Sequence, residues 1–103
     1  MLTVIAEIIC HSEQDFTTVL DSFNNIREQV LKEPGCHLYD VHIDHPAVDS
    51  ALHTKVPFSI MMYEKWESMQ HLETHMHSIN MQQHAQATEG AVAHVQIRIL
   101  EAQ

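Results

Sequence analysis

The sequence predicts an α+β domain of the ferredoxin-like kind, β-α-β-β-α-β, with an antiparallel four-stranded sheet and both helices on one face. Three observations lead there. The 103 residues are 45% hydrophobic and 18% charged, which suits a single globular domain over residues 1–103. Apolar residues alternate with a period of two in four short segments, as in strands. In two further segments they recur every three or four residues, as on one face of a helix.

The first strand and the first helix are the clearest of these elements. Residues 2–10 alternate, but both faces of that strand are largely apolar. Ser12 is a good helix N-cap, with Asp15 three residues later as an imperfect capping-box partner. An apolar stripe then runs from Phe16 to Leu31. Pro34-Gly35 ends that helix.

The middle of the chain contains two strands and a loop. Residues 36–44 alternate and predict the second strand. Residues 45–57 have no clear period and contain two prolines, so we expect a long loop there. The third strand is expected over residues 58–66.

The period changes at Trp66, and the second helix and the last strand follow. Apolar side chains recur at helical spacing from Met69 onward, with a possible break near His77-Ser78 and a resumption to about Thr88. Gly90 closes the helix. Residues 91–100 predict the last strand, with one wholly apolar face.

The two-sided apolar strands predict a homodimer. In this topology both helices pack on one face of the sheet, and the other face is left open. Because the first and third strands are apolar on both faces, something must cover the second face. Burial of apolar area gains about 25 cal/mol per Å². We therefore expect two sheets to pack face to face and close a dimeric α+β barrel.

The charge and cysteine content of the chain argue against nucleic acid, anionic membranes and metal ions as partners. Five Lys and Arg stand against fourteen Asp and Glu, for a net charge of −9, which disfavours nucleic acid and anionic membrane surfaces. The apolar start has no basic segment before it, and no run approaches the roughly 20 residues that span a bilayer. Cys10 and Cys36 have no metal-binding or redox spacing. A bacterial cytoplasmic protein with two free thiols fits these observations.

The polar side chains that could bind or react with a ligand are concentrated where the third strand meets the second helix. Glu64 shares a strand face with Phe58 and other apolar residues, so its carboxylate must be paired or its pKa must rise. Its partner could be a backbone amide or Arg98, or it could be catalytic. Trp66 is either a core aromatic or a pocket wall. His75 is either a satisfied helix histidine or a general base.

The other histidines do not predict a metal site. His71 and His75 are four residues apart, but neither the glutamate of an HExxH motif nor a cysteine pair accompanies them. We expect no bound metal. Five histidines are expected to be solvated: His11, His45, His53, His77 and His84. The methionines of the third strand and second helix are either an adaptable pocket lining or core filler.

Two motifs carry a resemblance to a known family. The segment from Glu33 to Val41, EPGCHLYDV, resembles the entry to the second strand in antibiotic biosynthesis monooxygenase-like domains. Tyr63-Glu64-Lys65-Trp66, followed by Leu72 and His75, resembles that family's "yE.W.....L..H" pattern. The similarity extends over nearly the whole chain. It implies a dimeric α+β barrel with a pocket between each sheet and its own helices.

Individual positions match the family unevenly. Glu64, Trp66 and His75 match its strand-end Glu and Trp and its helix His. Asn80 stands where many members have a second His. The polyphenol oxygenases carry an Asn where this chain has Met62, and the heme degraders carry an Asn late in the first strand, where Glu7 and Ile8 stand here. Both departures argue against those two specific activities.

The resemblance implies a cofactor-independent monooxygenase that acts on a small aromatic phenol or quinol in an apolar pocket between sheet and helices. No cofactor or metal is expected. His75, Trp66 and Glu64 are the expected catalytic residues. The expected substrate-binding residues are Phe58, Met62, Tyr39, Leu72, Asn80 and Arg98. Two alternatives stay open: a non-catalytic dimer that binds a small ligand, and a heme-binding or heme-degrading relative.

Overall fold

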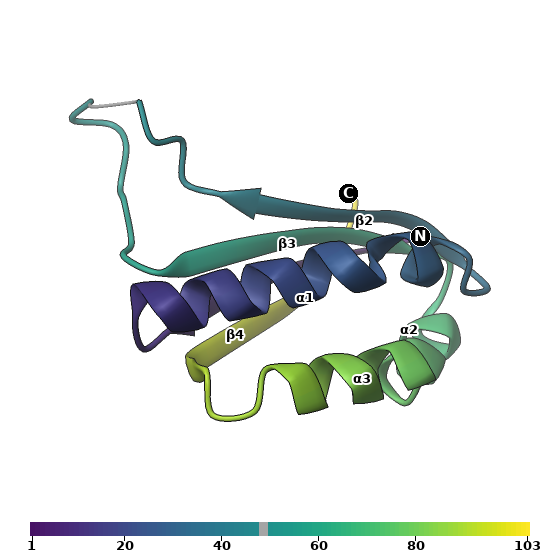
Figure 1. The fold of residues 1–103 in the computed structure, drawn as a ribbon. Coiled ribbons are helices and arrows are strands. Elements are labelled where there is room, and N and C mark those ends of the chain that lie inside the picture. The colour runs from purple at the N-terminus through teal and green to yellow at the C-terminus, as the bar shows by residue number, and fades with distance from the viewer. Residues whose placement is uncertain (48–49) are drawn as a thin grey trace.

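A computed structural model describes residues 1–47 and 50–103 of the chain. The elements follow one another as β1 (Leu2–Cys10), α1 (Glu13–Leu31), β2 (Cys36–Ile43), β3 (Ser59–Trp66), α2 (Met69–Met76), α3 (Ile79–Ala87) and β4 (Val92–Glu101). The four strands form one antiparallel sheet in the order β2-β3-β1-β4. The helices lie together on one face of it (Figure 1). The predicted ferredoxin-like fold is confirmed.

The predicted second helix is two helices. α2 ends at Met76, and the chain turns at His77 before Ser78 caps α3 by accepting a hydrogen bond from the amide of Met81. A serine side chain at an N-cap satisfies an amide that has no partner within the helix. The expected break near His77-Ser78 is therefore confirmed. It lets α3 turn back along α1 (Figure 1).

α1 is capped and terminated by the residues that predicted it. The Ser12 hydroxyl accepts a hydrogen bond from the amide of Asp15 at 3.1 Å. After the helix, Gly35 has a φ of +79°, a conformation that L side chains rarely adopt. A Cβ atom at Gly35 would also collide with the imidazole of His71 on α2. Glycine at this position thus allows the α1–β2 turn to pack directly against α2.

The sheet face under the helices forms the core, but only over part of its width. The residues of β1 and β3 that face the helices, among them Val4, Ile60 and Trp66, are buried. On β4 the corresponding side chains, Val95 and Ile97, remain about half exposed although they lie on the same face. The helices therefore leave the β4 side of this face uncovered.

The opposite face of the sheet carries no described element (Figure 1). Ile5, Ile9 and Tyr63 lie on that face and are only partly buried, and Met61 is exposed. This is the face on which the sequence predicts a second copy. Among the described residues, no helix has the length and apolar character needed to cross a membrane.

The described parts of the loop between β2 and β3, residues 44–47 and 50–58, project away from the body of the domain (Figure 1). Its base is held by a 2.8 Å hydrogen bond from the amide of Val56 to the Asp44 carboxylate. Phe58 closes it with a φ of 58°, and its carbonyl accepts a hydrogen bond from the Cys10 amide. Residues 48–49 of the predicted loop lie outside the described residues.

Candidate active site

A cavity of about 410 Å³ lies between the inner face of the sheet and the helices α2 and α3. Its walls are mostly apolar side chains of β1, β3, β4 and the helices. Five lining residues bring polar atoms to it: Tyr39, Glu64, His75, His84 and Thr88. An apolar cavity with a few convergent polar groups is the usual form of a small-molecule site.

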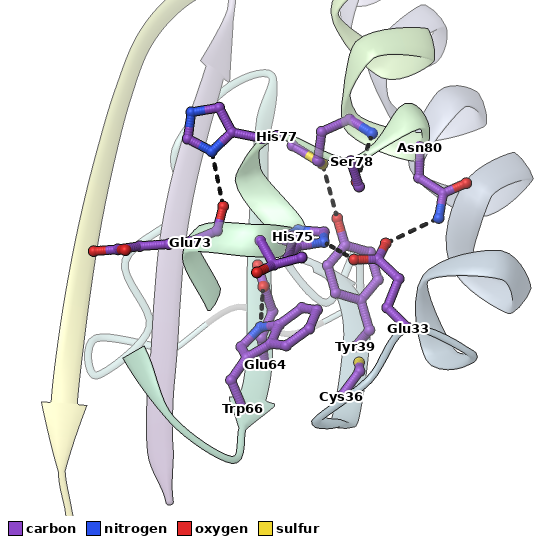
Figure 2. Close-up of polar contacts among 12 residues, drawn as sticks. Glu33, Cys36, Tyr39, Glu64, Trp66, Glu73, His75, His77, Ser78 and Asn80 are labelled. Carbon is purple, nitrogen blue, oxygen red and sulfur yellow. Dashed lines mark hydrogen bonds and ion pairs between the residues drawn. The ribbon is translucent and has the colours of Figure 1, made fainter. Parts of the chain in front are cut away.

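His75 is held at the cavity wall by a partly buried carboxylate, that of Glu33. Its side chain is 2% exposed, and its Nδ1 lies 3.0 Å from Oε1 of Glu33. The amide of Asn80 donates a hydrogen bond of 2.9 Å to the other Glu33 oxygen (Figure 2). A carboxylate only accepts, so Nδ1 of the neutral imidazole carries the proton and Nε2 keeps its lone pair.

Aromatic rings on either side set the plane of this imidazole. The indole of Trp66 lies against it with a centroid distance of 4.4 Å, and the phenol ring of Tyr39 meets it edge-on at 5.6 Å. Burial lowers the pKa of His75, and the Glu33 carboxylate works in the opposite direction. His75 is therefore neutral near pH 7 and can accept a proton.

The free nitrogen of His75 is reachable from the cavity. Every fully buried side-chain nitrogen or oxygen among the described residues has a hydrogen-bond partner. Nε2 of His75 makes no hydrogen bond with a described residue, so it cannot be among those fully buried atoms. Because His75 lines the cavity and only 2% of it is exposed, we infer that Nε2 opens on the cavity.

Glu64 is the second titratable group in this part of the cavity. Its side chain is buried, and Oε1 accepts a 2.9 Å hydrogen bond from the indole N–H of Trp66 (Figure 2). Burial raises the pKa of Glu64 to about 7, the Trp66 hydrogen bond lowers it, and the nearby Glu33 raises it further. The alternative partner, Arg98, lies opposite Ile5 on the outer face of the sheet and does not reach Glu64. Glu64 is thus poised between acid and carboxylate near neutral pH.

Replacing Glu64 with Gln is expected to change how stability depends on pH. Between about pH 4.5 and 7 the unfolded chain loses the Glu64 proton while the folded protein keeps it. Folding therefore favours the protonated form of Glu64, and the stability gained in this way is lost as pH rises through that window. Relative to the unchanged protein, Glu64→Gln should gain up to about 3 kcal/mol in unfolding free energy between pH 5 and pH 8. Denaturant unfolding of both proteins at several pH values measures this, and parallel curves would contradict it.

The expected site residues separate into three groups in the structure. The residues of the first group line the cavity: Tyr39, Met62, Glu64, Leu72 and His75. These residues come from β2, β3 and α2, so the fold brings them together from three elements.

Two expected site residues lie behind the lining. Trp66 is completely buried and lies behind His75 rather than on the cavity surface. Asn80 bonds to Glu33 and acts on His75 only through that carboxylate. Both can position the imidazole without touching a bound ligand.

The last two lie away from the cavity. Phe58 is 40% exposed at the end of the β2–β3 loop. Arg98 is exposed on the outer face of the sheet. Neither side chain lines the cavity.

Two residues of the site were not expected from the sequence. Glu33 appeared only inside the EPG motif, with no assigned role, yet it holds both His75 and Asn80. His84 was expected to be solvated, and this is wrong, because it is 8% exposed and lines the cavity. The spacing of Met81, His84 and Thr88 at i, i+3 and i+7 places them on one helix face and could have indicated its burial.

The histidines at metal-ligand spacing are engaged elsewhere. His71 pairs through Nδ1 with the Ser68 hydroxyl at 2.7 Å, whereas His75 pairs with Glu33. Within the described ranges, 1–47 and 50–103, no group of three or more His, Cys, Asp or Glu residues is arranged to hold a metal ion.

The chain is similar to known proteins over nearly its whole length. The profile of the family described as "Antibiotic biosynthesis monooxygenase" matches residues 1–88. The chain is 43% identical over 102 residues to a protein of Escherichia coli named "Probable quinol monooxygenase YgiN", covering 98% of this chain and 97% of that one. The protein of that name in Shigella flexneri matches equally well.

Solved structures show the same fold at lower sequence identity. PA3566 from Pseudomonas aeruginosa superposes with a TM-score of 0.81 at 22% identity, over 99% of this chain and 93% of that chain. Rv0793 from Mycobacterium tuberculosis does so with a TM-score of 0.78 at 16% identity, over 99% and 94%. Since the family profile covers well over half of the chain and the relatives match nearly all of it, this protein belongs to the antibiotic biosynthesis monooxygenase family.

Proposed function

We propose that this protein is a cofactor-independent monooxygenase that oxidises a small aromatic hydroquinone bound in the cavity. The observation that carries the proposal is the free nitrogen of His75, which lines an apolar cavity and has a partly buried carboxylate on its other nitrogen. The name of the E. coli relative, a probable quinol monooxygenase at 43% identity, supports the choice of substrate class.

His75 supplies the base. A phenolic hydroxyl donates to Nε2 and transfers its proton there, while Nδ1–H stays bonded to Glu33. The resulting imidazolium lies beside the Glu33 carboxylate, so the His75–Glu33 pair is neutral overall. Asn80 holds the second carboxylate oxygen and keeps Glu33 aimed at the ring.

The phenolate then reacts with dioxygen. It gives up one electron to form superoxide and an aryloxyl radical, which recombine into a peroxide on a ring carbon. Loss of that carbon's proton and cleavage of the O–O bond form a carbonyl and release the second oxygen as water. The balance is hydroquinone plus O₂ to hydroxyquinone plus water. The apolar walls offer few polar groups to the anion, so its charge is stabilised mainly by the imidazolium of His75.

Glu64 and Trp66 support this chemistry from the same end of the cavity. Oε2 of Glu64 makes no hydrogen bond with a described residue and, like Nε2 of His75, is therefore reachable from the cavity. With its pKa raised to about 7, Glu64 in its acid form can donate a hydrogen bond to a substrate oxygen. Trp66 fixes that carboxyl group and stacks behind His75.

Oxygen uptake tests the proposed function. Chelator-treated protein that shows no flavin absorbance is mixed with a panel of substituted hydroquinones in an oxygen electrode, and protein-free autoxidation is subtracted. We expect one O₂ consumed per hydroquinone, without accumulation of hydrogen peroxide. Ligands that raise the melting temperature but cause no uptake above the protein-free rate would instead indicate a non-catalytic binding protein.

We expect the protein to act as a homodimer joined by the outer faces of its two sheets. That face carries the partly buried Ile5, Ile9 and Tyr63 and the exposed Met61, and no described element covers it. Sedimentation should therefore give about twice the mass of the 11.8 kDa chain. A folded monomer at micromolar concentration would contradict this arrangement.

A further inference from the structure

A second imidazole lines the cavity and has no role in the chemistry proposed above. His84, on α3, is buried, and its Nδ1 lies 2.8 Å from the hydroxyl of Ser22 on α1. Ser22 is itself buried. The ring packs on Phe23 with a centroid distance of 4.1 Å. His84 is therefore fixed in position and orientation by two neighbouring residues of α1.

The open nitrogen of this imidazole faces the cavity, by the same reasoning that places Nε2 of His75 there. Nε2 of His84 makes no hydrogen bond with a described residue, yet no fully buried polar side-chain atom of the described chain lacks one. His84 is a lining residue and is otherwise buried, so its exposed part opens on the cavity. A polar atom that opens on a cavity and has no protein partner is available to a ligand.

The two imidazoles are anchored at separate places along α1. His75 is held by Glu33, just beyond the end of the helix at Leu31, and His84 is held by Ser22. Ser22 lies nine residues before Leu31, which is roughly 14 Å along the helix axis. The two imidazoles are therefore held at separate places on the cavity wall, and a ring that bonds to both must lie between them.

The Ser22–His84 pair can either accept or donate at the cavity. If Nδ1–H donates to the Ser22 hydroxyl, Nε2 accepts a hydrogen bond; if the hydroxyl donates to Nδ1, Nε2–H donates one. Burial lowers the pKa of His84 to about 4, so the imidazole stays neutral in both arrangements at neutral pH. One side chain can thus pair with a phenolic hydroxyl or with a quinone carbonyl.

We propose that His84, held by Ser22, is a second binding site in the cavity, which takes the oxygen on the far side of a ring whose first oxygen meets His75. This inference rests on the proposed function and assigns a binding partner to the second oxygen of the hydroquinone. The hydroxyl of the substrate donates to Nε2, and the carbonyl of the product accepts from Nε2–H. The same site therefore binds the ring before and after oxidation.

Two ligands that differ by one oxygen test this site. Isothermal titration under nitrogen compares 1,4-dihydroxynaphthalene with 1-naphthol, using the full chain. We expect the dihydroxy ligand to bind about tenfold more tightly, the value of one well-formed hydrogen bond. His84→Phe keeps an aromatic ring against Phe23 and should abolish that preference without changing the affinity for 1-naphthol. Ser22→Ala, which removes only a hydroxyl, should reduce the preference.

The matched control is His77→Phe, the same substitution at an exposed histidine that does not line the cavity, and it should leave the tenfold preference in place. Equal affinities for the two ligands in the unchanged protein would overturn the second site, as would an equal loss of both affinities in His84→Phe. In either case oxygen uptake by the unchanged protein would still support the proposed function. If neither ligand binds, the second site and the aromatic substrate class both fail.

Discussion

Replacing His75 with alanine should slow oxygen uptake by roughly 10²–10⁴ while the protein remains folded. Among the described residues, His75 is the histidine that both lines the cavity and pairs with a carboxylate. The substitution removes this imidazole. Glu33 keeps its hydrogen bond from Asn80, so its carboxylate is not left wholly without a partner. Steady-state oxygen uptake and circular dichroism on the same preparations measure the two parts of this prediction.

Two further variants separate a base from a structural histidine. His77→Ala removes an imidazole that bonds only to the Glu73 carbonyl and should leave the rate unchanged. Glu33→Gln keeps a hydrogen-bonding group beside Nδ1 but removes the charge that stabilises the imidazolium, so it should lower the rate less than His75→Ala does. If His75→Ala keeps its rate and only loses about 1–3 kcal/mol of unfolding free energy, His75 is a packing residue.

Trp66→Ala should be the most destabilising single change at the site, with a loss of about 3–5 kcal/mol in unfolding free energy. The indole is completely buried between the core and His75, so truncation leaves a large cavity. It also takes away the N–H donor of the buried Glu64. Denaturant unfolding monitored by circular dichroism gives the value, because the variant has no tryptophan fluorescence.

Trp66→Phe is the control that separates packing from hydrogen bonding. Phenylalanine retains most of the buried ring but cannot donate to Glu64, so the loss of stability should be smaller. The pKa of Glu64, already raised to about 7, should rise further because the hydrogen bond that lowers it is gone. A Trp66→Phe protein in which the Glu64 pKa falls or stays the same would show that the indole does not stabilise the carboxylate.

The hydrophobic periodicity predicted the fold because, in each element, the caps, turn residues and apolar pattern indicate the same secondary structure. The capping serines Ser12 and Ser78 and the turn glycine Gly35 act where the sequence places them. The alternation of β3 also predicted which of its side chains would face the core, including Glu64 and Trp66. Local rules of this kind depend on neighbours within a few residues, which a single sequence displays.

The site could be predicted only in part because its decisive contacts are long-range. Glu33 and His75 are separated by 42 positions, and no local pattern pairs them. His84 and Ser22 are 62 positions apart and meet only because α3 returns along α1. Arg98 was a plausible partner for Glu64 by charge, but the pairing register of β4 with β1 puts it on the other face of the sheet. A one-residue change of register reverses the face of every side chain in a strand.

Isotopic oxygen shows directly whether this cavity inserts an oxygen atom from O₂ into a hydroquinone. Metal-free and flavin-free protein is given a hydroquinone under ¹⁸O₂, and the product is analysed by mass spectrometry in parallel with His75→Ala. We expect one ¹⁸O atom in each hydroxyquinone and the other in water, with labelling lost to the protein-free level in His75→Ala. A product that is the simple quinone without ¹⁸O, formed at the same rate by both proteins, would contradict oxygen insertion in this cavity.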